Sequence, residues 1–319
     1  MEKIKKLYSI MRQFGIIFSL KYVFFKVTNN NEKYIKLIYK YVERFLEPLI
    51  NEYNSREYAI PENSKAHERF HVWICWWQGE EKMPELCKIC YQRLQQMLPS
   101  NADIHLITSR NFKEFIDIPK CILTQLEENK ITITYFSDIL RESLLAKYGG
   151  LWIDSTVYVS NRISEDYFSN YQFWSVKIPP DYIDKKYIGQ EISKGKWCGF
   201  IMLGKCGNVL NSFVKDAMYL YAKSHDTIID YFLQNLIIAI GYDRIPKLRA
   251  LLDALPYNNI SIYELYEIID EEFQEDKWLD LTKDSSFFKL TWKRQYLPVT
   301  ENGVPNFYSY LLRLYNEVQ

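Results

Sequence analysis

The chain has 319 residues, of which 48% are hydrophobic and 25% charged, and its formal net charge is zero. This ordinary globular composition allows a sizeable core in one large or two modest domains. The charge is uneven: residues 1–50 carry ten Lys or Arg against four Glu, a balance of +6, which leaves −6 for residues 51–319. A negative main body disfavours nucleic-acid binding.

Residues 1–60 are predicted to form a basic, amphipathic helical extension. Apolar and aromatic residues are interleaved with cations here, a pattern typical of segments that lie on an anionic membrane surface. The alternative is a helical hairpin packed on the main domain. The longest apolar run, 14–20, is too short to span a bilayer, and no cleavable secretion signal is recognisable. We therefore expect a cytoplasmic protein, peripheral at the inner face of the cell membrane if this segment binds lipid.

Strands and helices are predicted to alternate along the rest of the chain. The expected strands are 71–77, 104–108, a strand ending at 154, 173–178 and 200–203, and the expected helices are 84–97, 112–115, 137–147 and most of 209–254. Ser137 and Asp138 are expected to cap their helix, residues 132–136 to be extended, and residues 182–196 to form a loop. This alternation predicts an α/β fold, a Rossmann-type open mixed sheet flanked by helices.

The sequence Tyr-Gly-Gly-Leu-Trp-Ile-Asp at 148–154 joins a predicted helix to a predicted buried strand. Gly149 and Gly150 supply a left-handed stop that residues with a Cβ resist. A carboxylate at the end of an apolar strand is costly to desolvate unless it meets a cation or hydrogen-bond donors. Asp154 is therefore a candidate site residue; the alternative is an acidic, solvated strand end.

Three segments could converge at the carboxyl ends of the strands, where open α/β sheets bind ligands. They are residues 72–79, which end with tryptophans beside a glycine, the start of the 137–147 helix, and Asp154. An indole can stack on a base, Arg141 can pair with phosphate or sugar oxygens, and Asp154 can hold a divalent cation that neutralises a diphosphate. Together these parts suit a nucleotide-diphosphate sugar.

The motifs Trp-Trp-Gln-Gly at 76–79, Pro84, Ser-Asp-x-x-Arg at 137–141 and Tyr-Gly-Gly-x-Trp-x-Asp at 148–154 occur in this order. They resemble those of the bacterial capsular polysaccharide synthesis proteins, which are related to family 32 glycosyltransferases and more distantly to clostridial glucosylating toxins. The resemblance does not cover the helical extension. It implies a GT-A-like glycosyltransferase domain over residues 61–319. The implied enzyme is hexosyltransferase-like and moves a sugar, with retention, from a nucleotide donor, a UDP-sugar first, to a capsular or cell-surface polysaccharide repeat unit.

The resemblance also implies roles for single residues. Trp77 matches the tryptophan that stacks on uracil, with Trp73 as the alternative register. Asp138 and Arg141 match the pair that contacts the sugar hydroxyls and the phosphate of the donor. Gly150 belongs to the implied donor-binding set.

Asp154 matches the first acid of an Asp-x-Asp element, so the implied catalytic set is Asp154 with the Asp-x-x-Arg pair. The second acid is replaced by Thr156, which is counted among the donor-binding residues. A hydroxyl is a poor substitute for a carboxylate on a hard cation. We expect Mn²⁺ or Mg²⁺ at Asp154, with either weaker metal binding or a further acid from downstream, such as Asp230 or Glu301.

Two lysines late in the chain, Lys289 and Lys293, are candidates to stabilise charge on the leaving diphosphate; the alternative is a strand with solvated lysines. The expected partners are a nucleotide-sugar donor and a glycan acceptor, lipid-linked if the basic segment binds membrane. A catalytically silent donor-binding or scaffold member of a polysaccharide assembly complex is the alternative function. A nucleotide-binding module unrelated to sugars is disfavoured, because no phosphate-cradling Gly-rich loop is present.

Overall fold

The computed structural model describes residues 2–57, 70–168, 170–184 and 188–317. Its helices are α1 (Glu2–Phe14), α2 (Ile16–Val27), α3 (Asn31–Ser55), α4 (Glu85–Met97), α5 (Phe112–Phe115), α6 (Lys120–Glu127), α7 (Ile133–Tyr148), α8 (Ile188–Ser193), α9 (Val209–Ser224), α10 (Leu233–Arg244), α11 (Pro246–Asp253), α12 (Glu264–Ile268), α13 (Glu275–Lys283) and α14 (Phe307–Asn316), with short 3₁₀ turns at Glu80–Lys82 and Pro180–Tyr182.

A five-stranded mixed sheet lies at the centre of the main body. Its order is β2 (Ala102–Ile107), β1 (Phe70–Cys75), β3 (Gly150–Ile153), β6 (Ile201–Gly204) and β5 (Phe173–Ser175). The first three strands are parallel, whereas β6 is antiparallel to both β3 and β5. The predicted α/β architecture, an open mixed sheet flanked by helices, is therefore confirmed.

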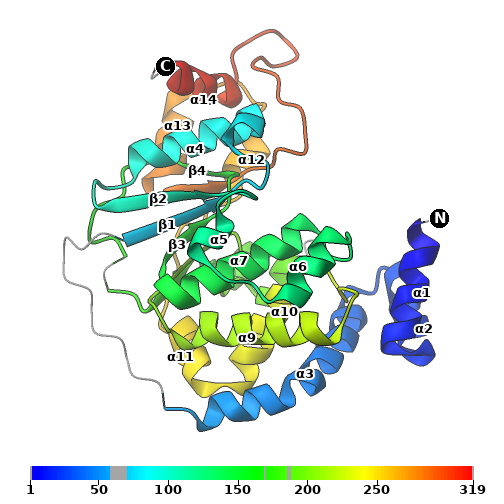
Figure 1. The fold of residues 1–319 in the computed structure, drawn as a ribbon. Helices are drawn as coiled ribbons and strands as arrows, with labels where there is room; N and C mark the ends of the chain where they lie inside the picture. The colour runs from blue at the N-terminus through cyan, green and yellow to red at the C-terminus, as the bar shows by residue number, and fades with distance from the viewer. Residues whose placement is uncertain (1, 58–69, 169, 185–187, 318–319) are drawn as a thin grey trace.

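Helices cover both faces of this sheet. Figure 1 shows α4, α12, α13 and α14 on one side and α7, α9 and α10 on the other. A second, two-stranded sheet pairs β4 (Val157–Val159) with β7 (Phe287–Lys289), which brings the C-terminal region against the turn after β3. The α4 side has its own apolar cluster, to which α4, α12, α13, α14 and both strands of the small sheet contribute.

Three local predictions were wrong. Helix α7 begins at Ile133, so Ser137 and Asp138 lie inside it; the cap is Thr132, whose hydroxyl accepts a hydrogen bond from the Tyr135 amide. The segment expected to be extended, 132–136, is thus the cap and first turn of this helix. Residues 182–196 are not a continuous loop, because α8 lies within them.

The N-terminal segment is helical, as predicted, and α3 packs against the main body. Ile38, Val42, Leu46 and Ile50 recur on one face of α3, are fully buried and belong to the same core as the central sheet. Helices α1 and α2 lie at the edge of the molecule (Figure 1). Within the described ranges, no helix combines the length and the apolar character needed to cross a bilayer.

Candidate functional site

A cavity of about 560 Å³ opens where the parallel strands β1 and β3 end. The three segments predicted to converge do meet here, joined by parts of the chain much further on. The lining residues are Cys75, Trp76, Trp77, Gln78, Ile133, Thr134, Ser137, Asp138, Arg141, Trp152, Asp154, Ser155, Thr156, Gly199, Phe200, Tyr231, Phe232, Gln234, Asn235 and the run 289–293.

Asp154 is the carboxylate at the centre of this cavity. It follows β3 directly, and its amide donates to the Phe200 carbonyl at 2.9 Å, which ties the strand end to the neighbouring β6. Its Oδ1 accepts from Arg141 at 3.2 Å and from the Trp152 indole at 3.0 Å, and its Oδ2 accepts from Lys289 at 2.9 Å. Burial alone would raise the pKa of Asp154, but the two cations more than offset this effect and hold the pKa below its ordinary value.

Arg141 is the cation that links the acids of the site. Its side chain is only 5% exposed, and one terminal nitrogen donates to Asp138 at 2.8 Å while the other donates to Asp154. The guanidinium also lies over the Trp152 ring, 4.9 Å from its centroid. A buried guanidinium held on three sides presents a fixed positive charge, which is the arrangement that an anionic ligand needs.

A network of buried polar side chains supports Arg141. Gln234 accepts from the guanidinium and donates to Glu142, which also accepts from Asn211 at 2.8 Å. Glu142 is completely buried, and this burial raises its pKa to about 7 despite those donors. We did not predict Glu142 or Gln234 from the sequence, although adjacent charges within an otherwise apolar stretch of α7 are a detectable sign of a buried polar network.

Asp138 lies one helical turn before Arg141, with its carboxylate facing the cavity rather than capping the helix. Burial raises its pKa to about 6, and the Arg141 charge only partly counters that rise. Two acids that share one arginine thus differ in ionisation: Asp154, with two cations, is the stronger acid. Below about pH 6 the negative charge of the site is therefore concentrated at Asp154, whereas Asp138 also ionises as the pH rises above its pKa.

Lys289 completes the site from the small sheet. It pairs with Val157 across the antiparallel β4–β7 ladder, and its ammonium donates to Asp154 at 2.9 Å and to the Thr156 hydroxyl at 2.7 Å. It is therefore not a solvated strand lysine. Lys293 also lines the cavity but is exposed.

The model of one protein family, described as "Capsular polysaccharide synthesis protein", matches residues 20–311. The chain belongs to this family. The match begins within α2, so it includes most of the helical extension that the motif resemblance did not cover. No curated protein sequence matches the chain. Among solved structures, the apo structure of the bifunctional glycosyltransferase WbbM is similar at 10% identity and a TM-score of 0.44, over 82% of this chain and 51% of that one. The chain thus spans about half of its length.

In this capsular polysaccharide synthesis protein, the tryptophans divide into two groups. Trp77 lines the cavity and packs on Phe112 and Phe136. Trp73 does not line the cavity: it is 1% exposed, and its indole donates to the Gly149 carbonyl at 2.9 Å. Their positions relative to β1 explain the difference: Trp73 lies inside the strand and is packed in the core, whereas Trp77 follows the end of the strand at Cys75, where the cavity opens.

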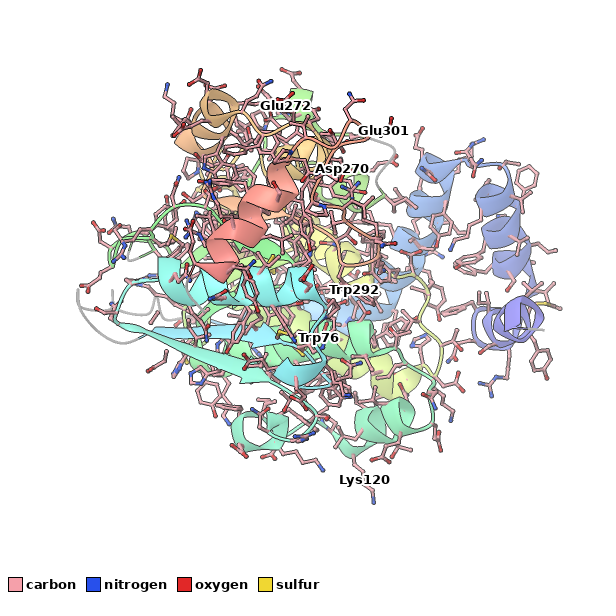
Figure 2. All side chains as sticks on the ribbon, turned by 90° about the horizontal axis from the view of Figure 1, so that it is seen from above. Trp76, Lys120, Asp270, Glu272, Trp292 and Glu301 are labelled. Atoms are coloured by element: carbon pink, nitrogen blue, oxygen red, sulfur yellow. The ribbon has the colours of Figure 1, made fainter. Side chains whose placement is uncertain are left out.

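Besides Trp77 and Trp152, the indoles of Trp76 and Trp292 line the cavity. Their ring centroids are 5.8 Å apart in an edge-to-face arrangement, and Figure 2 shows the two residues side by side. Trp76 stands in the motif quoted above, but we did not predict Trp292 as a site residue. Trp292 lies in the irregular segment after β7, where the sequence has no helical or strand periodicity from which its position could be inferred.

Gly150 does not line the cavity, although it is needed to build it. Its φ is +98°, and a Cβ there would lie 2.2 Å from the His71 carbonyl oxygen of β1. The predicted donor-binding contact is therefore not one that this residue makes from the cavity wall. Gly150 instead allows β3 to lie close to β1, because it has no Cβ to meet the His71 carbonyl oxygen.

The side chains at Asp154 do not form a cage for a divalent cation. Both of its oxygens already accept hydrogen bonds from cationic groups, and Thr156 offers only a hydroxyl, itself bonded to Lys289. The further acids are elsewhere: Asp230 bonds to Tyr34 outside the cavity lining, and Figure 2 shows Glu301 well away from the paired indoles. No group of three His, Cys, Asp or Glu residues suited to a metal occurs among the residues described. The dependence on Mn²⁺ or Mg²⁺ stays a prediction.

Proposed function

We propose that this protein is a glycosyltransferase of the GT-A type that moves a sugar from a nucleotide-diphosphate donor, a UDP-sugar first, to a capsular or cell-surface glycan. The observation that carries the proposal is the convergence of Arg141 and Lys289 on Asp154, at the carboxyl ends of the parallel strands and beside cavity-lining indoles. Fixed cations next to flat aromatic rings suit a ligand with a diphosphate and a base.

The chemistry asked of these groups is electrostatic. When the bond from the anomeric carbon to the diphosphate breaks, negative charge grows on the leaving oxygen, and preorganised cations lower the energy of that state. Arg141 and Lys289 would supply two such cations, in addition to the predicted Mn²⁺ or Mg²⁺. Asp154 orients both, and Trp77 is proposed to stack on the base. Retention of configuration is proposed from the family resemblance alone.

The test is nucleotide release from a panel of nucleotide sugars, followed by product analysis with a glycan acceptor. Asp138→Ala and Asp154→Ala are each expected to abolish release while circular dichroism shows an unchanged fold. Wild-type turnover in either variant would remove these residues from the site. Full activity in excess chelator would remove the predicted Mn²⁺ or Mg²⁺.

The alternative, a catalytically silent donor-binding or scaffold protein, is favoured by one observation. Asp154 and Thr156 are already paired with Lys289, which leaves no free carboxylate pair for a metal. Binding of a UDP-sugar by calorimetry without any turnover, across donors and acceptors, would support that alternative over the enzyme.

We also propose that the glycan acceptor is carried on a lipid, which would bring the enzyme to the inner face of the cell membrane. The basic and aromatic character of the N-terminal helices supports this proposal. A comparison of water-soluble and lipid-linked acceptors in the same transfer assay tests it, and equal use of both would count against it.

A further inference from the structure

The outward face of α2 is an apolar surface that the rest of the chain does not cover. The helix buries Ser19 and Tyr22 on its inner side. On its outer side, five large apolar residues are each 62–76% exposed: Ile16, Ile17, Leu20, Phe24 and Val27. Nine of the seventeen large hydrophobic residues that are exposed in the described part of the chain lie between positions 7 and 27. Contiguous exposure on this scale marks an interaction surface rather than ordinary surface scatter.

The charged residues of α1 and α2 from position 3 onward are all cations. From position 3 to position 27 the sequence has six Lys or Arg and no Asp or Glu. Two of these cations attach the helices to the main body, since Arg12 pairs with Asp226 and Lys26 with Asp230. Lys21 remains exposed on α2, and α3 adds exposed cations at 36, 40 and 44. The partner of this face must therefore be apolar at its centre and anionic around it.

We propose that the outer face of α2, together with α1, docks on an anionic lipid bilayer, with α2 lying in the plane of the interface. A helix with apolar residues on one side and lysines at its flanks has the chemistry of an interfacial anchor. A second copy of the chain fits less well: a two-fold contact would place this face against itself and bring like charges together, with no acid between positions 3 and 27 to pair with them.

The helix that carries the docking surface is joined, through its inner side and α3, to the loop beside the cavity. The Tyr22 hydroxyl donates to the Ile229 carbonyl at 3.1 Å, and the Tyr34 hydroxyl donates to the Asp230 carboxylate at 2.5 Å. The next two residues, Tyr231 and Phe232, line the cavity. The inner side of α2 thus contacts the loop that forms one wall of the site, and only the thickness of this helix separates that loop from a bilayer held by the outer face. This second half of the inference rests on the proposed function, because it presents a lipid-linked acceptor to the sugar donor.

The experiment is co-sedimentation of the full chain with vesicles, using phosphatidylcholine alone or phosphatidylcholine with phosphatidylglycerol. The wild type should bind vesicles that contain phosphatidylglycerol more tightly, by roughly tenfold or more, than vesicles of phosphatidylcholine alone. The double variant Leu20→Asp, Phe24→Asp should lose ~100-fold in affinity, because each change removes a large apolar side chain from the interface and adds an anion. The matched control is Leu279→Asp, Leu297→Asp, which alters two equally exposed leucines elsewhere and should bind as the wild type does.

Three outcomes would overturn the inference. They are a wild type that ignores anionic vesicles, a double variant that binds them unchanged, and a wild-type dimer in solution that the double variant converts to monomer. Donor hydrolysis in solution, without vesicles, should be the same in the double variant and the wild type. Vesicle binding without hydrolysis would therefore count against the proposed enzyme alone, whereas hydrolysis without vesicle binding would count against the docking surface alone.

Discussion

Lys289 contacts Asp154 from 135 residues further along the chain, and in the proposed reaction it stands beside the leaving diphosphate. Lys289→Met removes that charge but keeps the length of the side chain. We expect nucleotide release at saturating donor to fall by roughly 100-fold or more, the usual effect of losing one preorganised electrostatic contact. The matched control is Lys293→Met, which removes an exposed lysine from the same cavity. Equal losses in the two variants would show that general positive charge matters, not the contact with Asp154.

Glu142 gives a pH-dependent prediction. Its pKa rises from 4.5 to about 7 on folding, so the folded state holds the proton more tightly than the unfolded state. The associated stability is fully present below pH 4.5 and is lost as the pH rises through 7, by on the order of 3 kcal/mol. We expect the free energy of unfolding of Glu142→Gln, from urea titrations at pH 5 and pH 7.5, to fall less across this window than that of the wild type. The control is Glu127→Gln, at an exposed position, which should lose as much unfolding free energy between pH 5 and pH 7.5 as the wild type does. The same loss in Glu142→Gln would contradict the prediction.

At the scale of elements, the turn from α7 into β3 depends on glycine. Gly150→Ala would put a Cβ 2.2 Å from the His71 carbonyl oxygen and would force β3 away from β1. We expect a loss of ~3 kcal/mol or more in unfolding free energy, or an insoluble protein. The control is Gly207→Ala, which also has a positive φ, +72°, but meets nothing within 4 Å. It should cost only about 1 kcal/mol, from backbone strain. Similar losses in both variants would mean that the strand contact is not what requires Gly150.

The elements that the sequence predicted well are those with local signals. Pro84 marks the start of α4, and the 112–115 helix was predicted with its exact bounds. The start of α7 was missed because Thr132 and Ser137 both offer a capping hydroxyl, and tertiary packing rather than local chemistry selects the first. Contacts between distant elements carry no local signal at all: Gln234 reaches Arg141 from α10, and nothing in the spacing of these residues indicates it. The acids and the arginine of the site were predictable because the motifs that hold them lie close together.

At the scale of the whole molecule, the N-terminal helices and the main body are one packed unit. The family match runs from residue 20 to residue 311, and α3 shares its core with the central sheet. The boundary predicted at residue 60 is a change in composition and charge, which need not coincide with a break in the core. Tyrosine hydroxyls add to the attachment: Tyr34 and Tyr53 on α3 donate to Asp230 and Asp216 of the main body.

Because α3 shares its core with the main body, a destabilising substitution in α3 should lower the unfolding free energy of the main body as well. Leu46→Ala removes a fully buried side chain from α3 and should lower the stability of the whole chain by ~2–5 kcal/mol. All eight tryptophans lie between positions 73 and 292, so tryptophan fluorescence reports only on the main body. We expect the fluorescence-detected urea midpoint to fall by the full amount in Leu46→Ala and to stay unchanged in Ile17→Ala, whose side chain is exposed. If fluorescence keeps the wild-type midpoint while circular dichroism shows an early loss of helix, the N-terminal helices unfold on their own, and the boundary at residue 60 separates two independent domains.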